Sequence, residues 1–252
     1  MRSSVAVAGL RSSVAVLVAV LVAALLSAGL AAPAFARPAP GIFAGVDLSR
    51  TAARGSSTTR DGGASFAGGG IVGQVRFGAA TEIGAHLGYR LDPSWSVFLG
   101  YRHARGAVRW NAAFPLFAIS SHFAGTASSD MLLASVGYEA PLSGATSFRA
   151  TAGIGPAFNR LSSVVETDEA TALFLAELSD RTRTAMAARL GVGIRHAVAG
   201  NVRLGLDAAA TYAGGFRTGA SRTGNLGVTD ITPYAIDRVW RGGVGAVVEV
   251  GF

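Results

Sequence analysis

The stretch from Ile83 to Tyr101 restricts the possible fold more than any other part of the chain. Apolar residues in it alternate with glycine, serine or charged residues on both sides of a short turn at Asp92-Pro93-Ser94. A period of two is typical of a β-strand, in which successive side chains point to opposite faces. The stretch therefore predicts two antiparallel strands with one apolar face and one face of glycine and charge.

The same alternation recurs along the rest of the chain. It is seen in residues 42–48, 132–138, 148–155, 186–195, 202–212 and 243–252, which together with the strands on either side of Asp92 predict eight strands. Several segments alternate over about ten residues, the length that a tilted strand needs to cross a bilayer, whereas soluble strands average about five or six. The pattern favours a membrane barrel over a soluble sandwich.

The connections between these strands alternate between short and long. Tight turns are predicted near residues 92, 143 and 200 and long loops near 58, 116, 170 and 222, as expected for periplasmic turns and extracellular loops. Residues 106–127 are predicted to be a long loop, and residues 167–178 a short amphipathic helix capped by Thr167. The predicted long loop is unusually apolar, which fits either contact with a partner or packing into the barrel mouth. Its apolar residues are Phe114, Leu116, Phe117, Ile119 and Phe123.

Aromatic residues flank the predicted tight turns. Tyr89 and Trp95 flank one turn, and Tyr138 and Phe148 flank another. Aromatic side chains gather where a membrane protein meets the interface, so these four predict a periplasmic girdle. The sequence thus predicts an all-β fold, an eight-stranded antiparallel up-and-down transmembrane β-barrel.

The first 36 residues have the features of an export signal. Arg2 and Arg11 supply positive charge, residues 14–30 form an apolar run, and Ala34-Phe35-Ala36 matches a cleavage site. An uncleaved transmembrane helix is the alternative, because the apolar run is long enough to span a bilayer. We expect a cleaved helical signal peptide at 1–36 and a barrel domain at 37–252, exported to the outer membrane of a bacterium.

Composition excludes several other classes. The chain has no cysteine, which excludes disulfides and thiolate sites, and all 22 of its basic residues are arginine. Its formal charge of +7 does not indicate nucleic-acid binding, because the arginines alternate with apolar residues instead of clustering on one helix. The Gly-rich run at 68–73 matches G-x-G-x-x-G, but no helical pattern follows it, so no cofactor is predicted.

Charged residues fall on the glycine-bearing face of the predicted strands. In a barrel of eight strands this face lines an interior only wide enough for side chains, and charges there must pair. We therefore predict a charge network that plugs the interior. Its predicted members are Asp47, Glu82, His86, Arg90, Arg102, Arg149, Arg189, Arg195, Arg203, Asp207 and Glu249.

A second set of arginines lies near the ends of the predicted long loops. Arginine binds phosphate through paired, charge-assisted hydrogen bonds, so these residues predict contact with lipopolysaccharide phosphates at the extracellular rim. Solvated rim charge without a ligand explains them equally well. The set is Arg105, Arg109, Arg160, Arg181, Arg183, Arg217, Arg238 and Arg241.

Two segments also carry a family resemblance. The hairpin sequence LGYRLDPSWSVFLGYR at 87–102 and the terminal GAVVEVGF, together with the signal peptide, resemble the OmpA/OmpX-type small outer-membrane barrels, which include surface-antigen and porin-like members. The resemblance implies that Phe252 is the signal read by the barrel assembly machinery. It also implies a monomer with a structural or surface-interaction role, with outer-membrane lipid and lipopolysaccharide as its surroundings.

Two other functions stay open as alternatives. One is a narrow channel for small or apolar solutes. The other is a lipid A-modifying enzyme, because some eight-stranded barrels have that activity and His122 follows two serines; the other histidines are His86, His103 and His196. The sequence contains neither H-E-x-x-H nor G-x-S-x-G, so no catalytic or metal site is predicted and we expect no enzyme activity.

Overall fold

The computed structural model describes residues 40–61, 70–115, 118–225 and 227–252. The expected signal peptide at 1–36 lies outside the described residues. Within the described part the strands belong to one antiparallel sheet. No helix in these ranges is long and apolar enough to cross a bilayer.

The strand bounds are as follows. They are β1 Gly41–Ser56, β2 Arg60–Asp61, β3 Gly70–Phe77, β4 Ala80–Arg90, β5 Trp95–Phe114, β6 Ile119–Ser143, β7 Thr146–Asp168, β8 Phe174–Leu178, β9 Arg181–Ala199, β10 Val202–Arg217, β11 Ser221–Gly224, β12 Gly227–Asp230 and β13 Ala235–Gly251.

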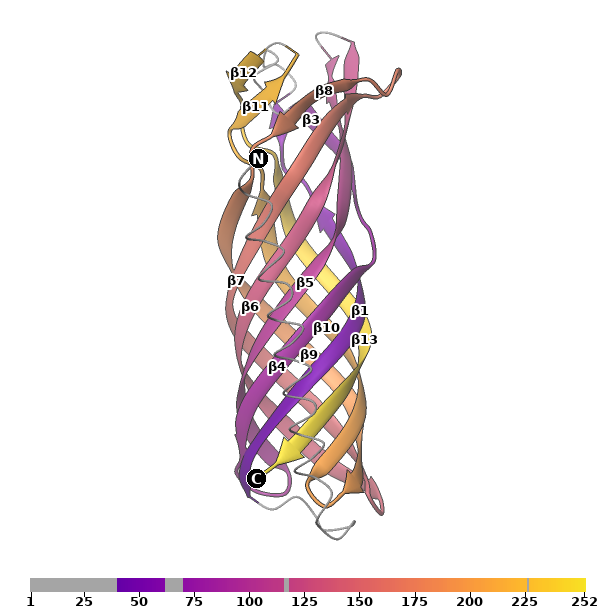
Figure 1. Ribbon diagram of the computed structural model, residues 1–252, viewed down its shortest axis with the longest axis vertical. Coiled ribbons are helices and arrows are strands. Elements are labelled where there is room, and N and C mark those ends of the chain that lie inside the picture. The colour runs from indigo at the N-terminus through magenta and orange to yellow at the C-terminus, as the bar shows by residue number, and fades with distance from the viewer. Residues whose placement is uncertain (1–39, 62–69, 116–117, 226) are drawn as a thin grey trace, which may run out of the picture.

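Eight of the described strands close into a ring, as predicted. The order around it is β1, β4, β5, β6, β7, β9, β10 and β13, and β13 pairs with β1. A row of paired residues that leaves β1 at Gly41 passes through every ring strand and returns to β1 at Thr51. This stagger requires tilted strands, which Figure 1 shows.

The two ends of the barrel differ in the length of their connections. The turns after β4, β6 and β9 are short and lie at the same end as the C-terminus, at the bottom of Figure 1. At the other end the strands extend further, and β3, β8, β11 and β12 add to the sheet (Figure 1). The long connections are thus gathered at one end, as the loop lengths predicted.

The prediction of a long loop at 106–127 was wrong. β5 continues to Phe114 and β6 begins at Ile119, and these two residues pair at the tip of one hairpin. The interior face of β5 becomes apolar here, with Val108 and Trp110 fully buried, while Arg105 and Arg109 point outward. In this part of β5 the apolar side chains point inward and the charged ones outward, which is the reverse of the arrangement nearer the short turns.

The prediction of a helix at 167–178 was also wrong. Phe174–Leu178 is strand β8, which pairs with β7 and β11. Asp168 does accept backbone hydrogen bonds, from Thr171 N at 2.7 Å and Ala170 N at 3.1 Å, but it closes a turn between two strands. A capping residue cannot by itself distinguish a helix start from a tight turn. The long loops predicted near residues 58 and 222 likewise contain the end of β1, the end of β10 and the β11–β12 hairpin, while residues 62–69 lie outside the described part.

An apolar core fills the extended end of the sheet. Trp110 and Phe123 stack with their ring centroids 5.2 Å apart, and Tyr234 packs against both. Of the residues expected in the apolar loop, Phe114 and Phe123 are buried in this core, while Leu116 and Phe117 lie outside the described part. The core also includes Val108, Leu161, Val164, Leu178, Phe216, Ile231, Ile236 and Val239.

Candidate functional site

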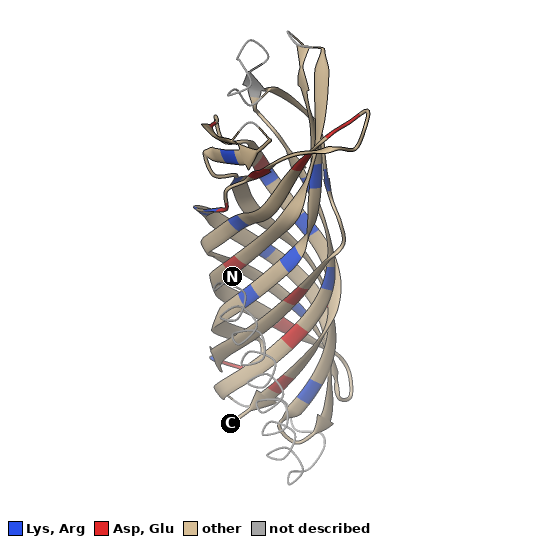
Figure 2. Ribbon diagram, turned by 45° about the horizontal axis from the view of Figure 1, so that its top comes forward, with Lys and Arg blue, Asp and Glu red and all other residues tan. Residues whose placement is uncertain are grey.

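Glycines on the interior face of the strands make room for charged side chains. A Cβ added at Gly84 would collide with the Asp47 carboxylate, and one at Gly193 would collide with the Asp207 carboxylate. The alternation of glycine and charge in the sequence is therefore a packing requirement. Figure 2 shows the charged positions distributed along the ring strands.

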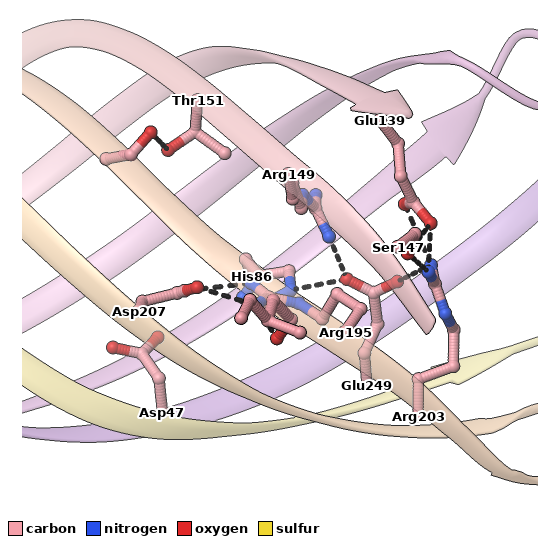
Figure 3. A network of polar contacts seen from close by, with 12 residues as sticks. Asp47, His86, Glu139, Ser147, Arg149, Thr151, Arg195, Arg203, Asp207 and Glu249 are labelled. Atoms are coloured by element: carbon pink, nitrogen blue, oxygen red, sulfur yellow. Dashed lines mark hydrogen bonds and ion pairs between the residues drawn. The ribbon is translucent and has the colours of Figure 1, made fainter. Parts of the chain in front are cut away.

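Glu249 on β13 lies at the centre of the cluster nearest the short turns. Its carboxylate is fully buried, and Arg90 Nη2 donates to Glu249 Oε1 at 2.8 Å. Arg149 donates to Glu249 Oε2, and Arg203 Nη1 lies 3.4 Å from Oε1 (Figure 3). His86 Nε2 is 3.6 Å from Oε2, an ion-pair distance rather than a hydrogen bond. One buried carboxylate is therefore shared by several arginines.

A second carboxylate in this cluster is Glu139 on β6. Arg203 Nη1 donates to Glu139 Oε2 at 3.0 Å. The Ser147 hydroxyl donates to Glu139 Oε1 at 2.5 Å and accepts from Arg203 Nη2 at 2.8 Å (Figure 3). Neither Glu139 nor Ser147 was predicted as a member of the network. Their position on the same face as Gly137 and Arg149 was the signal that could have identified them.

Two arginine–aspartate pairs lie further along the interior. Arg195 donates two hydrogen bonds to Asp207, from Nη1 to Oδ1 at 2.5 Å and from Nη2 to Oδ2 at 2.8 Å. Arg102 holds Asp47 in the same way, with distances of 2.6 and 3.1 Å. Such paired contacts between a guanidinium and a carboxylate are stronger and more directional than single ones.

Glu82 connects two arginines on opposite sides of the ring. Its Oε1 accepts from Arg102 Nη1 and from Arg189 Nη1, both at 2.9 Å. Arg189 Nη1 also donates to the Thr211 hydroxyl at 2.9 Å. The structure thus brings ten of the eleven predicted interior residues into ion pairs and places the eleventh, His86, beside Glu249.

Little space is left between these side chains. A cavity of about 30 Å³ lies among Asp47, His86, Arg195 and Asp207, and another of about 10 Å³ lies above it beside Arg241. Spaces of this size accommodate single water molecules. Above them the apolar core begins, since the Arg241 guanidinium lies 5.9 Å from the Phe216 ring.

Six of the predicted rim arginines are exposed at the extended end. They are Arg105, Arg109, Arg160, Arg181, Arg217 and Arg238. Arg183 is half-buried and pairs with Asp237 at 3.0 Å. Arg241 does not belong to the rim, because it is only 5% exposed and points into the barrel. Arg241 lies on the same face as Gly243 and Gly245, which assigns it to the interior.

Exposed aromatic residues border the apolar outer surface at both ends. Tyr89, Trp95 and Tyr138 point outward beside the short turns, with the Trp95 and Tyr138 centroids 5.0 Å apart, and Phe148 is half-buried. Phe252 is 70% exposed at this end, and its N–H donates to Ile42 O at 2.8 Å. A second set, not predicted, lies at the other border. It consists of Tyr101, Phe158 and Trp240, which are exposed, and Tyr212, which is half-buried.

Each histidine has a polar neighbour other than a serine. His103 Nδ1 lies 2.8 Å from Asp130 Oδ1, His122 Nδ1 lies 2.9 Å from Asn111 Oδ1, and His196 Nδ1 lies 2.9 Å from Thr146 Oγ1. His86 lies beside Glu249, as described above. Within the described ranges no group of three or more metal-ligating side chains could hold an ion.

The extended end also contains titratable groups in and around its apolar core. Arg222 Nε donates to Glu166 Oε2 at 2.6 Å, and the Ser121 hydroxyl donates to Glu166 Oε1 at 2.8 Å. Burial raises the pKa of Tyr234, and the Glu166 charge raises it further. Hydrogen bonds from the Thr171 side chain and backbone lower the pKa of Asp168.

A closed ring of tilted antiparallel strands, apolar outside and ion-paired inside, defines the protein as a β-barrel of the bacterial outer membrane. The chain belongs to the family described as the outer membrane protein β-barrel domain, whose model matches residues 21–232. No curated protein matches its sequence.

Several solved structures resemble this chain in fold. They include outer membrane protein OprG from Pseudomonas aeruginosa, with 13% identity, 84% of this chain and 97% of that chain covered, and a TM-score of 0.47. Neisserial surface protein A has 16% identity, coverage of 84% and 97%, and a TM-score of 0.44. Outer membrane protein AlkL has 17% identity, coverage of 87% and 95%, and a TM-score of 0.44. These likenesses concern the fold alone.

Proposed function

We propose that the protein is a closed outer-membrane barrel with a structural and surface-interaction role, in which the charge network plugs the interior. The observation that carries this proposal is the succession of three ion-pair clusters along the interior, around Glu249, Asp207 and Glu82, with cavities of about 30 and 10 Å³ among the described residues there. The apolar core above them adds a second obstacle to ions. Opening a path would leave buried charges without partners, which is costly.

Planar-bilayer conductance tests the proposed plug. The refolded mature protein, whose insertion is verified by its heat-modifiable shift on gels, is expected to add no steady current to that of the bare bilayer. Glu82→Ala removes the carboxylate shared by Arg102 and Arg189. This variant is expected to conduct more current than the wild type. Long-lived open steps in the wild-type protein would favour the alternative, a narrow channel.

Exposed apolar residues at the extended end support the surface-interaction part of the proposal. Leu173 is 66% exposed and Val228 is 70% exposed. Apolar side chains held out in water by a folded sheet often mark a contact surface. A Leu173→Ser, Val228→Ser variant is expected to reduce adhesion of cells that overproduce the protein. Unchanged adhesion, with equal surface amounts of both proteins, would contradict this role.

The exposed rim arginines support a second proposal, that the outer leaflet holds the barrel through lipopolysaccharide phosphates. Arg105 and Arg238 lie just beyond the outer aromatic residues, at the level where headgroup phosphates are expected. Replacing Arg105, Arg109 and Arg238 with Gln is expected to reduce co-purifying lipopolysaccharide and resistance to detergent. A comparison variant, Arg54→Gln with Arg76→Gln, replaces two exposed arginines of the same end that are outside the predicted rim set, Arg76 being paired with Arg109 across β3 and β5. Lipopolysaccharide content in the triple variant equal to that of the wild type would reject the anchoring role.

The assembly and girdle assignments belong to the same proposal. Phe252 is proposed as the residue read by the barrel assembly machinery, and Tyr89, Trp95, Tyr138 and Phe148 as the periplasmic girdle. Deletion of Phe252 is expected to lower the amount of folded protein in cells more than the yield of refolding in detergent. Mass spectrometry of lipid A from an overproducing strain separates these structural roles from the enzymatic alternative.

A further inference from the structure

Arginines outnumber carboxylates inside the barrel. The interior arginines are Arg90, Arg102, Arg149, Arg189, Arg195, Arg203 and Arg241, and the interior carboxylates are Asp47, Glu82, Glu139, Asp207 and Glu249. Glu249 and Glu82 are shared between arginines, so the surplus is not removed by pairing. Because buried charge is normally neutralised, this interior has the electrostatics of an anion site.

Arg241 is the interior arginine without an ion pair among the described residues; Glu82 is near enough to act on its charge but is shared by Arg102 and Arg189. Its side chain is 5% exposed, no carboxylate of the described residues lies within ion-pair distance, and its Nη1 has no hydrogen-bond partner there. Phe216 covers the guanidinium from the apolar core, so solvent from the extracellular end is excluded. Outside the described ranges the sequence contains no Asp or Glu, and Asp61 is the one carboxylate whose side chain is not described.

The small cavity beside Arg241 has other free donors. Ser49 Oγ lines it and has no partner among the described residues. The Thr211 hydroxyl also lines it and accepts from Arg189, which leaves its own hydrogen free to donate. The volume of about 10 Å³ leaves room for one small species at most.

The carboxylates that line the same cavity are already neutralised. Asp47 is held through both oxygens by Arg102, and Asp207 through both oxygens by Arg195. They therefore oppose an anion less than free carboxylates would, while Arg241 and Arg189 attract it.

We propose that the barrel interior binds one small inorganic anion of the chloride class against Arg241, with Ser49 and Thr211 as hydroxyl donors. The anion neutralises the buried guanidinium beneath the apolar core. Binding to the folded state alone stabilises that state in proportion to the logarithm of anion concentration. Folded protein should consequently depend on the kind of anion present as well as on ionic strength.

The test compares chloride with gluconate, an anion too large for the cavity, at one ionic strength. The readout is the temperature at which the refolded mature protein loses its heat-modifiable compact band. Chloride is expected to raise this temperature in the wild type and in Arg238→Met, an exposed arginine of the same strand. Arg241→Met is expected to show no difference between the salts. An equal response in all three proteins, or no response in any, would overturn the proposal and leave a water molecule in the cavity.

A milder variant keeps the test decisive if Arg241→Met does not fold. Ser49→Ala retains the Arg241 charge and removes one donor, so the chloride concentration at half effect is expected to rise about tenfold, the effect of one hydrogen bond to a charge. Crystals of the wild-type protein grown in bromide should give an anomalous peak within hydrogen-bonding distance of Arg241 Nη1. Absence of that peak, together with an unchanged half-effect concentration in Ser49→Ala, would reject the site.

Discussion

At the scale of single residues, Glu249 contacts more oppositely charged side chains than any one of its partners does. It is fully buried and accepts from Arg90 and Arg149, with Arg203 and His86 close by. Removing one member of a buried ion pair is costly because the remaining charge keeps its desolvation penalty. Here the loss of one carboxylate would leave several cations facing each other.

Substitution Glu249→Gln keeps the shape of this side chain and removes its charge. We expect the free energy of unfolding to fall by about 3–5 kcal/mol, as is typical when one partner of a buried pair is removed. Urea titration of the protein in lipid vesicles measures this. The control is Asp180→Asn, whose pair with Arg160 is exposed, where a change of only about 0–1 kcal/mol is expected. Equal losses in the two variants would contradict the central role of Glu249.

The raised pKa of Tyr234 predicts that the stability of the extended end depends on pH. Because burial raises its pKa above the ordinary value of 10.0, the folded state holds the phenolic proton more tightly than the unfolded state. The associated stabilisation is complete below about pH 10 and is lost as the pH rises through the folded-state pKa. Trp110 fluorescence, measured with Trp95 and Trp240 replaced by Phe, reports on this core and should change at high pH when Tyr234 is present. In Tyr234→Phe the change should be much smaller, and an identical profile would refute the assignment.

At the scale of the elements, the long strands change character along their length. The lower part of β5 has Val97 and Leu99 outward and Arg102 inward, whereas its upper part has Arg105 and Arg109 outward and Trp110 inward. Lipid faces the first part and water faces the second, so the apolar side chains switch from the outer to the inner face. The position of this switch marks the outer border of the membrane.

Two arginine substitutions on the outer face of β5 test that border. Leu99→Arg places a charge on the apolar band and is expected to cost about 2–4 kcal/mol of folding free energy in lipid vesicles. Ala107→Arg adds the same charge on the same face above the switch, where a cost of only about 0–1 kcal/mol is expected. Both positions are exposed on the protein surface, so packing does not distinguish them. Similar costs at the two positions would show that the border is placed wrongly.

At the scale of the whole molecule, the barrel has a defined orientation in the membrane. The short turns and Phe252 lie at one end, and the apolar core with β8, β11 and β12 lies at the other (Figure 1). In outer-membrane barrels short turns face the periplasm and long connections face outward.

Single-cysteine labelling tests this orientation, because the natural chain contains no cysteine. Ala170→Cys lies in the exposed turn after β7 and should react with a membrane-impermeant maleimide on intact cells. Ser143→Cys lies at the exposed end of β6 and should react only after the outer membrane is permeabilised. The opposite pattern of labelling would mean that the barrel is inverted.

The sequence alone was enough for the lower barrel because its strands alternate under one constant rule, apolar toward lipid and glycine or charge toward the interior. That rule identified the ring of eight strands, the class of membrane and the strand face on which the ion pairs lie. It failed above the membrane, where water replaces lipid and the apolar face turns inward. Residues 106–114, 119–127 and 174–178 were therefore predicted as loop or helix, although they lie in strands.

Only the tertiary structure decided which charges meet. Arg241 and Glu139 have the period of interior residues, but their partners are distant in sequence and depend on strand tilt and register, which no local pattern contains. Gly84 and Gly193 show the same dependence, since the space they leave is filled from neighbouring strands. Alternation along a strand is a local property that one sequence can display, whereas pairing across a barrel depends on how all eight strands are staggered.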